Sequence, residues 1–178
     1  MIGVVLKRGK SVRQLLYYLY GPGREGEHVD PRLVSGWRPP ETLEPPLRAD
    51  GRRDFRHLAE LLDMPLALLG DDAPGLPVWH VYVRAAPGDP ELADAVWAAV
   101  TAELMHRTGL SEYEHEEGSV PWVAVRHGHD HVHIAAVLAR LDCRRALLRN
   151  DYRQIGAAMA WAEREYGLQA VPGRRPHS

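Results

Sequence analysis

Apolar residues recur along the chain at two spacings, which separate expected strands from expected helices. Continuous apolar runs predict buried strands at residues 2–8 and 76–86. Helical spacing predicts helices at residues 12–20, 54–70, 89–110 and about 150–166. Pro65 is expected to kink or divide the second of these helices. Residues 21–50 hold six prolines and little periodicity, which predicts a long loop.

The segment from residue 119 to 142, SVPWVAVRHGHDHVHIAAVLARLD, is apolar over most of its length. As a single strand, residues 120–140 would be about 69 Å long, whereas a globule of this size is about 40 Å across. The chain therefore has to turn, and Gly128, His129 and Asp130 provide the natural place for the turn. We predict an antiparallel hairpin with arms at 120–127 and 131–140.

The order of these elements predicts an α+β fold, in which a central antiparallel or mixed β-sheet carries helices on one face. With 178 residues and 45% hydrophobic content, the chain is long enough to form one domain, predicted at residues 1–168. Residues 169–178 are expected to be a C-terminal linker or tail that leads to further domains in a longer protein.

The composition narrows the class of protein. No run approaches the ~20 apolar residues of a membrane span, and the N-terminal residues lack the order of a signal peptide, so a cytoplasmic protein without a membrane partner is expected. A single cysteine, Cys143, excludes an intramolecular disulfide. The net charge of −2 disfavours a broad basic surface. Arginines nevertheless gather after the histidines, either as a solvated surface or as phosphate contacts.

Four histidines occupy every second position of RHGHDHVHI at residues 126–134. In the second arm of the hairpin, His131 and His133 share one face, and across the turn His127 can lie beside His131. Three neutral imidazoles bind a divalent metal and leave positions open for substrate. His129 is expected to point away at the turn, and Asp130 could orient one imidazole. The alternative is a polar sheet face with hydrogen-bonded histidines.

Two enzyme families use histidines at such a spacing. The histidine-triad nucleotide hydrolases have a His-hydrophobe-His-hydrophobe-His run along one strand, but here Asp130 stands where a hydrophobe belongs and the predicted turn interrupts the strand. Members of the His-hydrophobe-His endonuclease superfamily cut single-stranded DNA with a tyrosine and a metal. LLYYLYGPG at residues 15–23 supplies Tyr17, Tyr18 and Tyr20, although any one tyrosine alone is more often a packing residue.

Nearly the whole chain resembles the relaxase or mobilisation nuclease domains of that superfamily, especially the form found in conjugative elements of actinobacteria. The segments that carry the resemblance are LLYYLYGPGREGEHVDPRLVSGW (15–37), VWHVYVRAAPGD (78–89), WVAVRHGHDHVHIAAVLAR (122–140) and NDYRQIGAAMAWAEREYGL (150–168). The histidine segment is the most specific of them.

The resemblance implies a role for each candidate residue. Tyr18 is the expected nucleophile, with Tyr20 second, and His127, His131 and His133 are the expected ligands of a divalent metal, Mg or Mn. Asp130 occupies the acidic position that supports the histidines. Three further residues are near family motifs and are expected either to support the metal ligands or to contact DNA: His28, Asp30 and His80.

The implied activity is metal-dependent, site- and strand-specific nicking of single-stranded DNA at a transfer origin through a 5′-phosphotyrosyl intermediate, as in plasmid mobilisation. The expected partners are that DNA and accessory relaxosome and coupling proteins. Candidate phosphate contacts are Arg144, Arg145, Arg149 and Arg153, and Trp37 or Trp79 could stack on unpaired bases. Two alternatives remain: a rolling-circle replication initiator with the same chemistry, and a non-catalytic, metal-stabilised nucleic-acid-binding module.

Overall fold

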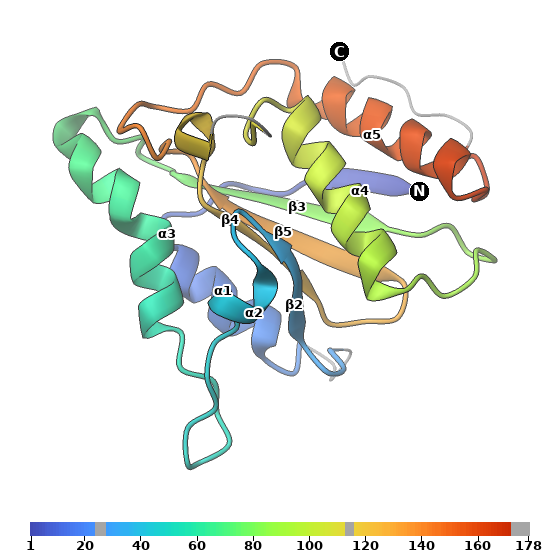
Figure 1. Ribbon diagram of the computed structural model, residues 1–178, viewed down its shortest axis with the longest axis horizontal. Helices are drawn as coiled ribbons and strands as arrows, with labels where there is room; N and C mark the ends of the chain where they lie inside the picture. The colour runs from blue at the N-terminus through green and yellow to red at the C-terminus, as the bar shows by residue number, and fades with distance from the viewer. Residues whose placement is uncertain (24–27, 113–115, 172–178) are drawn as a thin grey trace.

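A five-stranded antiparallel sheet forms the centre of the computed structural model, which describes residues 1–23, 28–112 and 116–171 (Figure 1). The strands are β1 (Ile2–Val5), β2 (Arg32–Gly36), β3 (Val78–Arg84), β4 (Trp122–Arg126) and β5 (His131–Val137). Their order across the sheet is β1-β3-β5-β4-β2, and every neighbouring pair is antiparallel. The predicted α+β fold with a central antiparallel sheet is confirmed.

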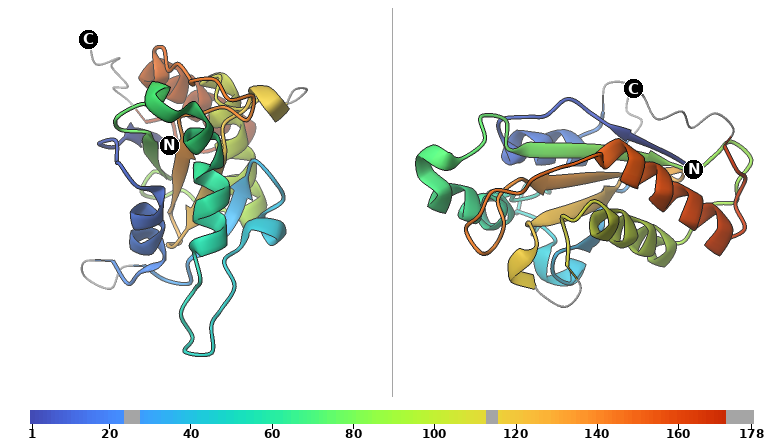
Figure 2. Two further views of the ribbon diagram at one scale, coloured as in Figure 1. Left: turned by 90° about the vertical axis from the view of Figure 1, so that its left-hand side faces the viewer. Right: turned by 90° about the horizontal axis from the view of Figure 1, so that it is seen from above.

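Helices cover both faces of this sheet. They are α1 (Val12–Tyr20), α2 (Pro40–Leu43), α3 (Arg56–Leu69), α4 (Asp94–Arg107) and α5 (Asp151–Glu165), with 3₁₀ turns η1 (Gly70–Asp72) and η2 (Glu116–Gly118). Helices α4 and α5 pack on one face, and α1 and α3 pack on the other (Figure 2). The expectation of helices on one face only was therefore wrong. None of the described helices combines the length and the apolar composition of a membrane span.

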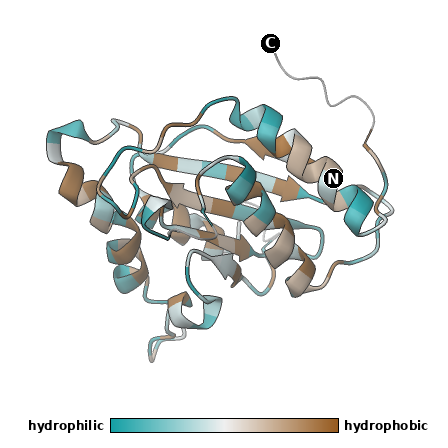
Figure 3. Ribbon diagram, turned by 45° about the horizontal axis from the view of Figure 1, so that its top comes forward, coloured by the Kyte–Doolittle hydropathy of each residue, from teal (hydrophilic) through white to brown (hydrophobic). Residues whose placement is uncertain are grey.

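Alternate residues of the strands feed two separate hydrophobic cores. On β3, Trp79, Val81 and Val83 face α4 and α5, whereas Val78 belongs to the core under α1 and α3. On β5, Ala135 and Val137 also face α1 and α3. In Figure 3 the strands are accordingly largely brown, the colour of hydrophobic residues, with pale and teal residues between. The face that carries the histidines is thus a second core over half of its length and polar only where β5 begins.

The hairpin predicted from the histidine segment is confirmed. Strands β4 and β5 pair in antiparallel register, with Val125 opposite His133 and Arg126 opposite Val132. The connection consists of residues 127–130, so the turn falls at the predicted place. Because β5 begins at His131, two of the histidines stand on a strand and the other two lie in the turn.

The segment expected to be a long loop contains β2 and α2. Strand β2 pairs with β4 at the edge of the sheet, and its residues Leu33 and Val34 are buried in different cores. A short strand that is apolar on both faces has no alternation, which explains why the pattern did not predict it. Pro65 is buried inside α3, which continues past it, so the helix is not divided.

Candidate metal centre

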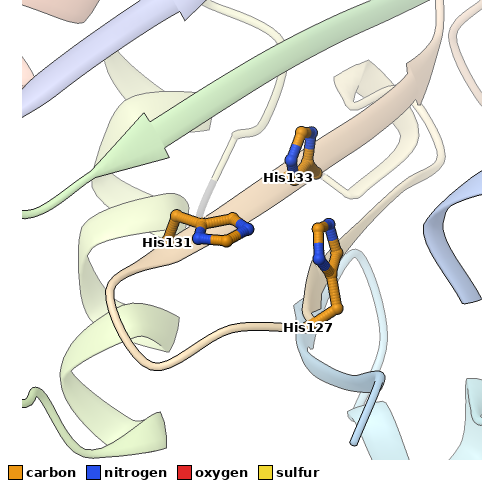
Figure 4. A group of neighbouring side chains, drawn as sticks. All are labelled: His127, His131 and His133. Atoms are coloured by element: carbon orange, nitrogen blue, oxygen red, sulfur yellow. The ribbon is translucent and has the colours of Figure 1, made fainter. Parts of the chain in front are cut away.

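Three histidines converge where the β4–β5 hairpin turns. His127 follows β4, while His131 and His133 stand on β5, and one nitrogen from each ring lies within 4.8 Å of the others (Figure 4). The ring centroid of His127 is 4.8 Å from that of His131 and 4.7 Å from that of His133. His127 and His133 are buried and His131 is partly buried. Three imidazoles offer a suitable donor set, and at these separations they could hold one divalent metal.

Neighbouring groups occupy the Nδ1 atoms of two of these rings. His131 Nδ1 donates to Asp130 Oδ1 at 2.7 Å, and His133 Nδ1 shares a hydrogen bond of 2.7 Å with Nε2 of His80. Nε2 is then the nitrogen that His131 and His133 offer to a metal. Contacts of this kind fix ring orientation in metal centres. Asp130 is itself held, because its Oδ2 accepts a hydrogen bond from Arg84 Nε at 2.7 Å.

The surroundings of His133 and His80 favour the neutral imidazole, the form that binds metals. Burial lowers the pKa of His133 to about 2, and the neighbouring histidines lower it further. Burial also lowers the pKa of His80 to about 4. Burial raises the pKa of the Asp130 carboxyl, but hydrogen bonds from His131 and Arg84 outweigh this effect and leave its pKa below the ordinary value. Asp130 therefore remains an acceptor for His131.

A buried arginine holds the turn. Arg126 donates from Nε to the carbonyl of Gly128 at 3.0 Å and from Nη2 to the carbonyl of His129 at 3.1 Å. Its Nη1 donates to Asp94 at 2.6 Å and its Nη2 to Glu91 at 3.0 Å. A Cβ atom at residue 128 would overlap the ring of His131, so any larger residue there would displace that ring. The side chain of His129 is exposed.

Tyr18 reaches the same cavity from α1. The cavity has a volume of about 780 Å³ and is lined by Tyr18, His28 and the three histidines, among others. The ring of His28 stands edge-on to that of Tyr18 at 5.3 Å and lies 3.6 Å from that of His127. His28 Nδ1 also lies 2.8 Å from the carbonyl oxygen of Gly21, just beyond α1. His28 therefore links the tyrosine helix to the histidines.

The structure does not bring Tyr20 to the histidines. Its hydroxyl donates to Glu44 at 2.9 Å, and its ring packs on Phe55. Burial, followed by the charge of Glu44, raises the pKa of this phenol. Tyr18, by contrast, is 44% exposed. The two tyrosines are two residues apart on a short helix. The Tyr20 phenol is enclosed by the protein and bonded to Glu44, whereas the Tyr18 phenol is exposed and is the one of the two that lines the cavity.

The arginines expected to hold phosphates lie elsewhere. None of them lines the cavity: Arg144, Arg145 and Arg149 follow the far end of β5, and Arg153 stands on α5, on the opposite side of the sheet. Trp79 is fully buried and donates to Asp151, and Trp37 packs against the core, so neither is presented to the cavity. The arginines that do line the cavity are Arg32, Arg84 and Arg126. Asp30 also lines it and contacts Arg32.

Tyr82 and Arg84 were not predicted as site residues, although the alternation of residues along β3 indicates them. On β3, His80, Tyr82 and Arg84 alternate with the core residues Val81 and Val83, so they share the face of the histidines. With His80 as a candidate, that alternation predicts Tyr82 and Arg84 on the same face. The ion pair between Arg126 and Asp94 could not be predicted from a local pattern, because 31 residues separate them along the chain.

Comparison with known proteins identifies the family. Residues 68–168, more than half of the chain, match the family model of relaxases described as "MobA/VirD2-like, nuclease domain". This range contains the histidine hairpin, His80 and Arg84, but neither Tyr18 nor His28. No curated protein and no solved structure matches the chain. The matched segment holds every element that builds the histidine cluster, and the chain belongs to the MobA/VirD2-like relaxase nuclease family.

Proposed function

We propose that this relaxase domain cuts and rejoins single-stranded DNA at a transfer origin with Tyr18 as its nucleophile. The observation that carries the proposal is an exposed phenol on α1 that opens onto the same cavity as three converging imidazoles. The family match supports the nuclease class. Accessory relaxosome and coupling proteins would be partners of such an activity.

His127, His131 and His133 are the proposed ligands of a divalent metal. Mg or Mn is proposed as the ion, since the family resemblance favours these two while imidazoles alone also accept zinc. When bound, the ion would supply Lewis acidity to an oxygen of the scissile phosphate. Asp130 orients the ring of His131, and His80 orients the ring of His133, each by a hydrogen bond at the Nδ1 atom of the ligand.

Tyr18 supplies the oxygen that attacks phosphorus. A bond forms between the Tyr18 oxygen and phosphorus while the bond between phosphorus and the 3′ oxygen breaks. The phenol loses its proton and the departing 3′ oxygen gains one. The product is a 5′-phosphotyrosyl enzyme and a free 3′-hydroxyl, and because the number of phosphoester bonds is unchanged the step can run backwards to rejoin the strand.

Cations around the cavity are available for the phosphates on either side of the cut. Arg84 is 51% exposed and Arg32 is 34% exposed, and both line the cavity. Each is paired with a carboxylate of the domain, which fixes its guanidinium in place. Fixed cations lower the cost of holding DNA in a single pose.

The proposal is tested by trapping the covalent product. Single-stranded oligonucleotides labelled at the 3′ end, drawn from DNA that contains the candidate origin, are incubated with the domain and Mn²⁺ and separated under denaturing conditions. The label stays with the protein if a 5′-phosphotyrosine forms, whereas a 5′ label leaves with the other fragment.

We expect Tyr18→Phe to abolish the labelled adduct and Tyr20→Phe to keep it. Tyr20→Phe is the matched control, because it removes a phenol from the same helix without touching the cavity. An adduct of wild-type yield in Tyr18→Phe would refute the assignment. Metal binding and DNA binding without any adduct would favour a non-catalytic binding module instead.

A further inference from the structure

The sheet face beside the histidines continues to the edge of the sheet. Strand pairing forms two rows across three strands: His133, Tyr82 and Val4 in one, and His131, Arg84 and Ile2 in the other. Residues directly opposite one another on antiparallel strands have side chains on the same face. Each row therefore leads from a proposed metal ligand through β3 to the edge strand β1.

This part of the face is open to solvent. Ile2 is 40% exposed and Val4 is 42% exposed, although both are apolar. Helix α5 packs against β1 from the opposite side, where Gly3 meets Ile155. The principal contacts of α1 and α3 with the sheet are at β5. Within the described ranges, no helix covers the outer half of this face.

We propose that this surface, made of Ile2, Val4, Tyr82 and Arg84 and called the edge face, binds an unpaired base and its phosphate beside the cut. The inference rests on the proposed function. Tyr82 offers an aromatic ring for stacking, a contact that every base can make. Ile2 and Val4 extend its apolar floor, and Arg84 provides a cation next to it.

Arg84 suits the phosphate of such a nucleotide. Its Nε donates to Asp130, which fixes the plane of the guanidinium, while half of the side chain stays exposed. Tyr82 and Arg84 also line the cavity that contains the histidines. The edge face is thus continuous with the proposed metal centre, so a strand whose phosphate lies at the histidines can reach it without crossing a helix.

The edge face and Tyr18 lie on opposite sides of the histidine cluster. Tyr18 approaches through His28 and His127, whose rings succeed one another at 5.3 Å and 3.6 Å. The ring of Tyr82 approaches from the other side, 5.0 Å from His133 and 5.4 Å from His131. A base on the edge face therefore leaves the approach of Tyr18 to the phosphate clear.

The test measures binding alone, with cleavage prevented. Fluorescence anisotropy follows a labelled 20-nucleotide oligo(dT) and an abasic strand of equal length, in the Tyr18→Phe background without added metal. Tyr82→Ala should weaken oligo(dT) binding about tenfold and leave the abasic strand unchanged. Tyr82→Phe, which keeps the ring, should bind oligo(dT) like the Tyr18→Phe parent. Tyr152→Ala is the control, since this tyrosine is 46% exposed on α5, across the sheet.

Three results would overturn the inference: oligo(dT) binding by Tyr82→Ala that equals the parent, an equal loss for both strands, or no binding of oligo(dT) by the parent. Thermal melting checks that Tyr82→Ala is folded, and if it is not, Tyr82→Leu replaces it in the same comparison. Because this experiment measures no adduct, a failure to distinguish oligo(dT) from the abasic strand would not affect the test of Tyr18 as nucleophile. Conversely, an absent adduct with base selectivity intact would count against the proposed chemistry alone.

Discussion

His129 and His131 show that residue type alone does not determine which histidines join the cluster. They are two positions apart and chemically identical, yet His129 is exposed in the turn while His131 points at His127 and His133. Asp130 stands between them and bonds to only one of them, His131. The position of the turn, rather than the regular spacing, selects which imidazoles meet.

Metal binding should therefore distinguish the two histidines. His131→Ala removes a proposed ligand and should weaken Mn²⁺ binding by at least about 100-fold, since even the loss of a supporting group costs 10- to 100-fold. His129→Ala should change the affinity less than about threefold, because its ring is not in the cluster. Isothermal titration calorimetry measures both. Equal losses in the two variants would contradict the division of roles.

The candidate site could be predicted from sequence where local geometry determines it. A length argument places the turn, and alternation places His131 and His133, so the convergence of three imidazoles follows from residues 126–134. The choice between Tyr18 and Tyr20 depends on what packs against α1. Glu44 and Phe55, which enclose Tyr20, are distant in sequence, so no local pattern could reveal them.

At the scale of elements, the hairpin depends on a side chain outside its turn. Arg126 ends β4 and is 4% exposed, yet it donates to two turn carbonyls and two carboxylates. A buried cation with this many acceptors fixes the backbone that carries His127 and His131. The turn is thereby tied to the start of α4 through Asp94.

Arg126→Gln should loosen the metal site without removing a ligand. It removes hydrogen bonds to two turn carbonyls and to two carboxylates that are 45% and 68% exposed, which should cost about 1–3 kcal/mol of stability and reduce Mn²⁺ affinity by about tenfold. Arg145→Gln is the control, because that arginine is exposed in the loop after β5. Chemical denaturation and calorimetry give the two quantities. Unchanged metal affinity in a folded Arg126→Gln domain would show that the turn does not need this side chain.

The same link predicts how stability responds to acid. Hydrogen bonds from Arg32, and to a smaller degree from Arg126, hold the pKa of the Asp94 carboxyl below its ordinary value of 3.8, although burial acts in the opposite direction. A carboxyl whose pKa is lower in the folded state stabilises the fold above the ordinary pKa, and this contribution is lost as the pH falls below it.

Wild-type stability should consequently fall more steeply than that of Asp94→Asn between about pH 5 and pH 3. At pH 7 the variant should be the less stable of the two, because it lacks the charge that both arginines contact. Urea unfolding at a series of pH values provides the comparison. Parallel curves over the acid range would show that Asp94 contributes nothing through its ionisation.

On the scale of the whole molecule, the sheet separates two cores with different tasks. The core under α4 and α5 holds most of the large buried side chains. The core under α1 and α3 is smaller, and it positions the helix that carries Tyr18 against the face that carries the histidines. The helices on both faces were not foreseen because His131 and His133 made one face of the hairpin look polar. Ala135 and Val137, further along the same face, are buried under α1 and α3.

Leu16→Ala tests whether the smaller core determines stability. Leu16 is fully buried between α1 and the sheet, so truncation should cost about 2–5 kcal/mol and lower the melting temperature by several degrees. Leu147→Ala is the matched control, since Leu147 is 71% exposed and should stay within about 0.5 kcal/mol. Similar melting temperatures for the two variants would mean that α1 is not stably packed.

The fold as a whole was predictable where an element is long and periodic. Helices α1, α3, α4 and α5 and strand β3 appear within a few residues of their predicted ranges. Strand β2 was missed because its five residues are stabilised by pairing with β4 rather than by their own pattern. Long-range pairing likewise sets the order of the strands, and this order brings Tyr82 and Arg84 beside the histidines.

The assignment of Tyr18 as the nucleophile is tested most directly by locating the covalently attached DNA on the protein. After reaction with a single-stranded origin oligonucleotide and Mn²⁺, nuclease trimming and protease digestion leave a short 5′-phosphorylated nucleotide on one peptide, which tandem mass spectrometry can sequence. We predict that the nucleotide is attached to Tyr18, the phenol that shares the cavity with the three histidines. Attachment to Tyr20 or Tyr82, or to no tyrosine, would contradict the account.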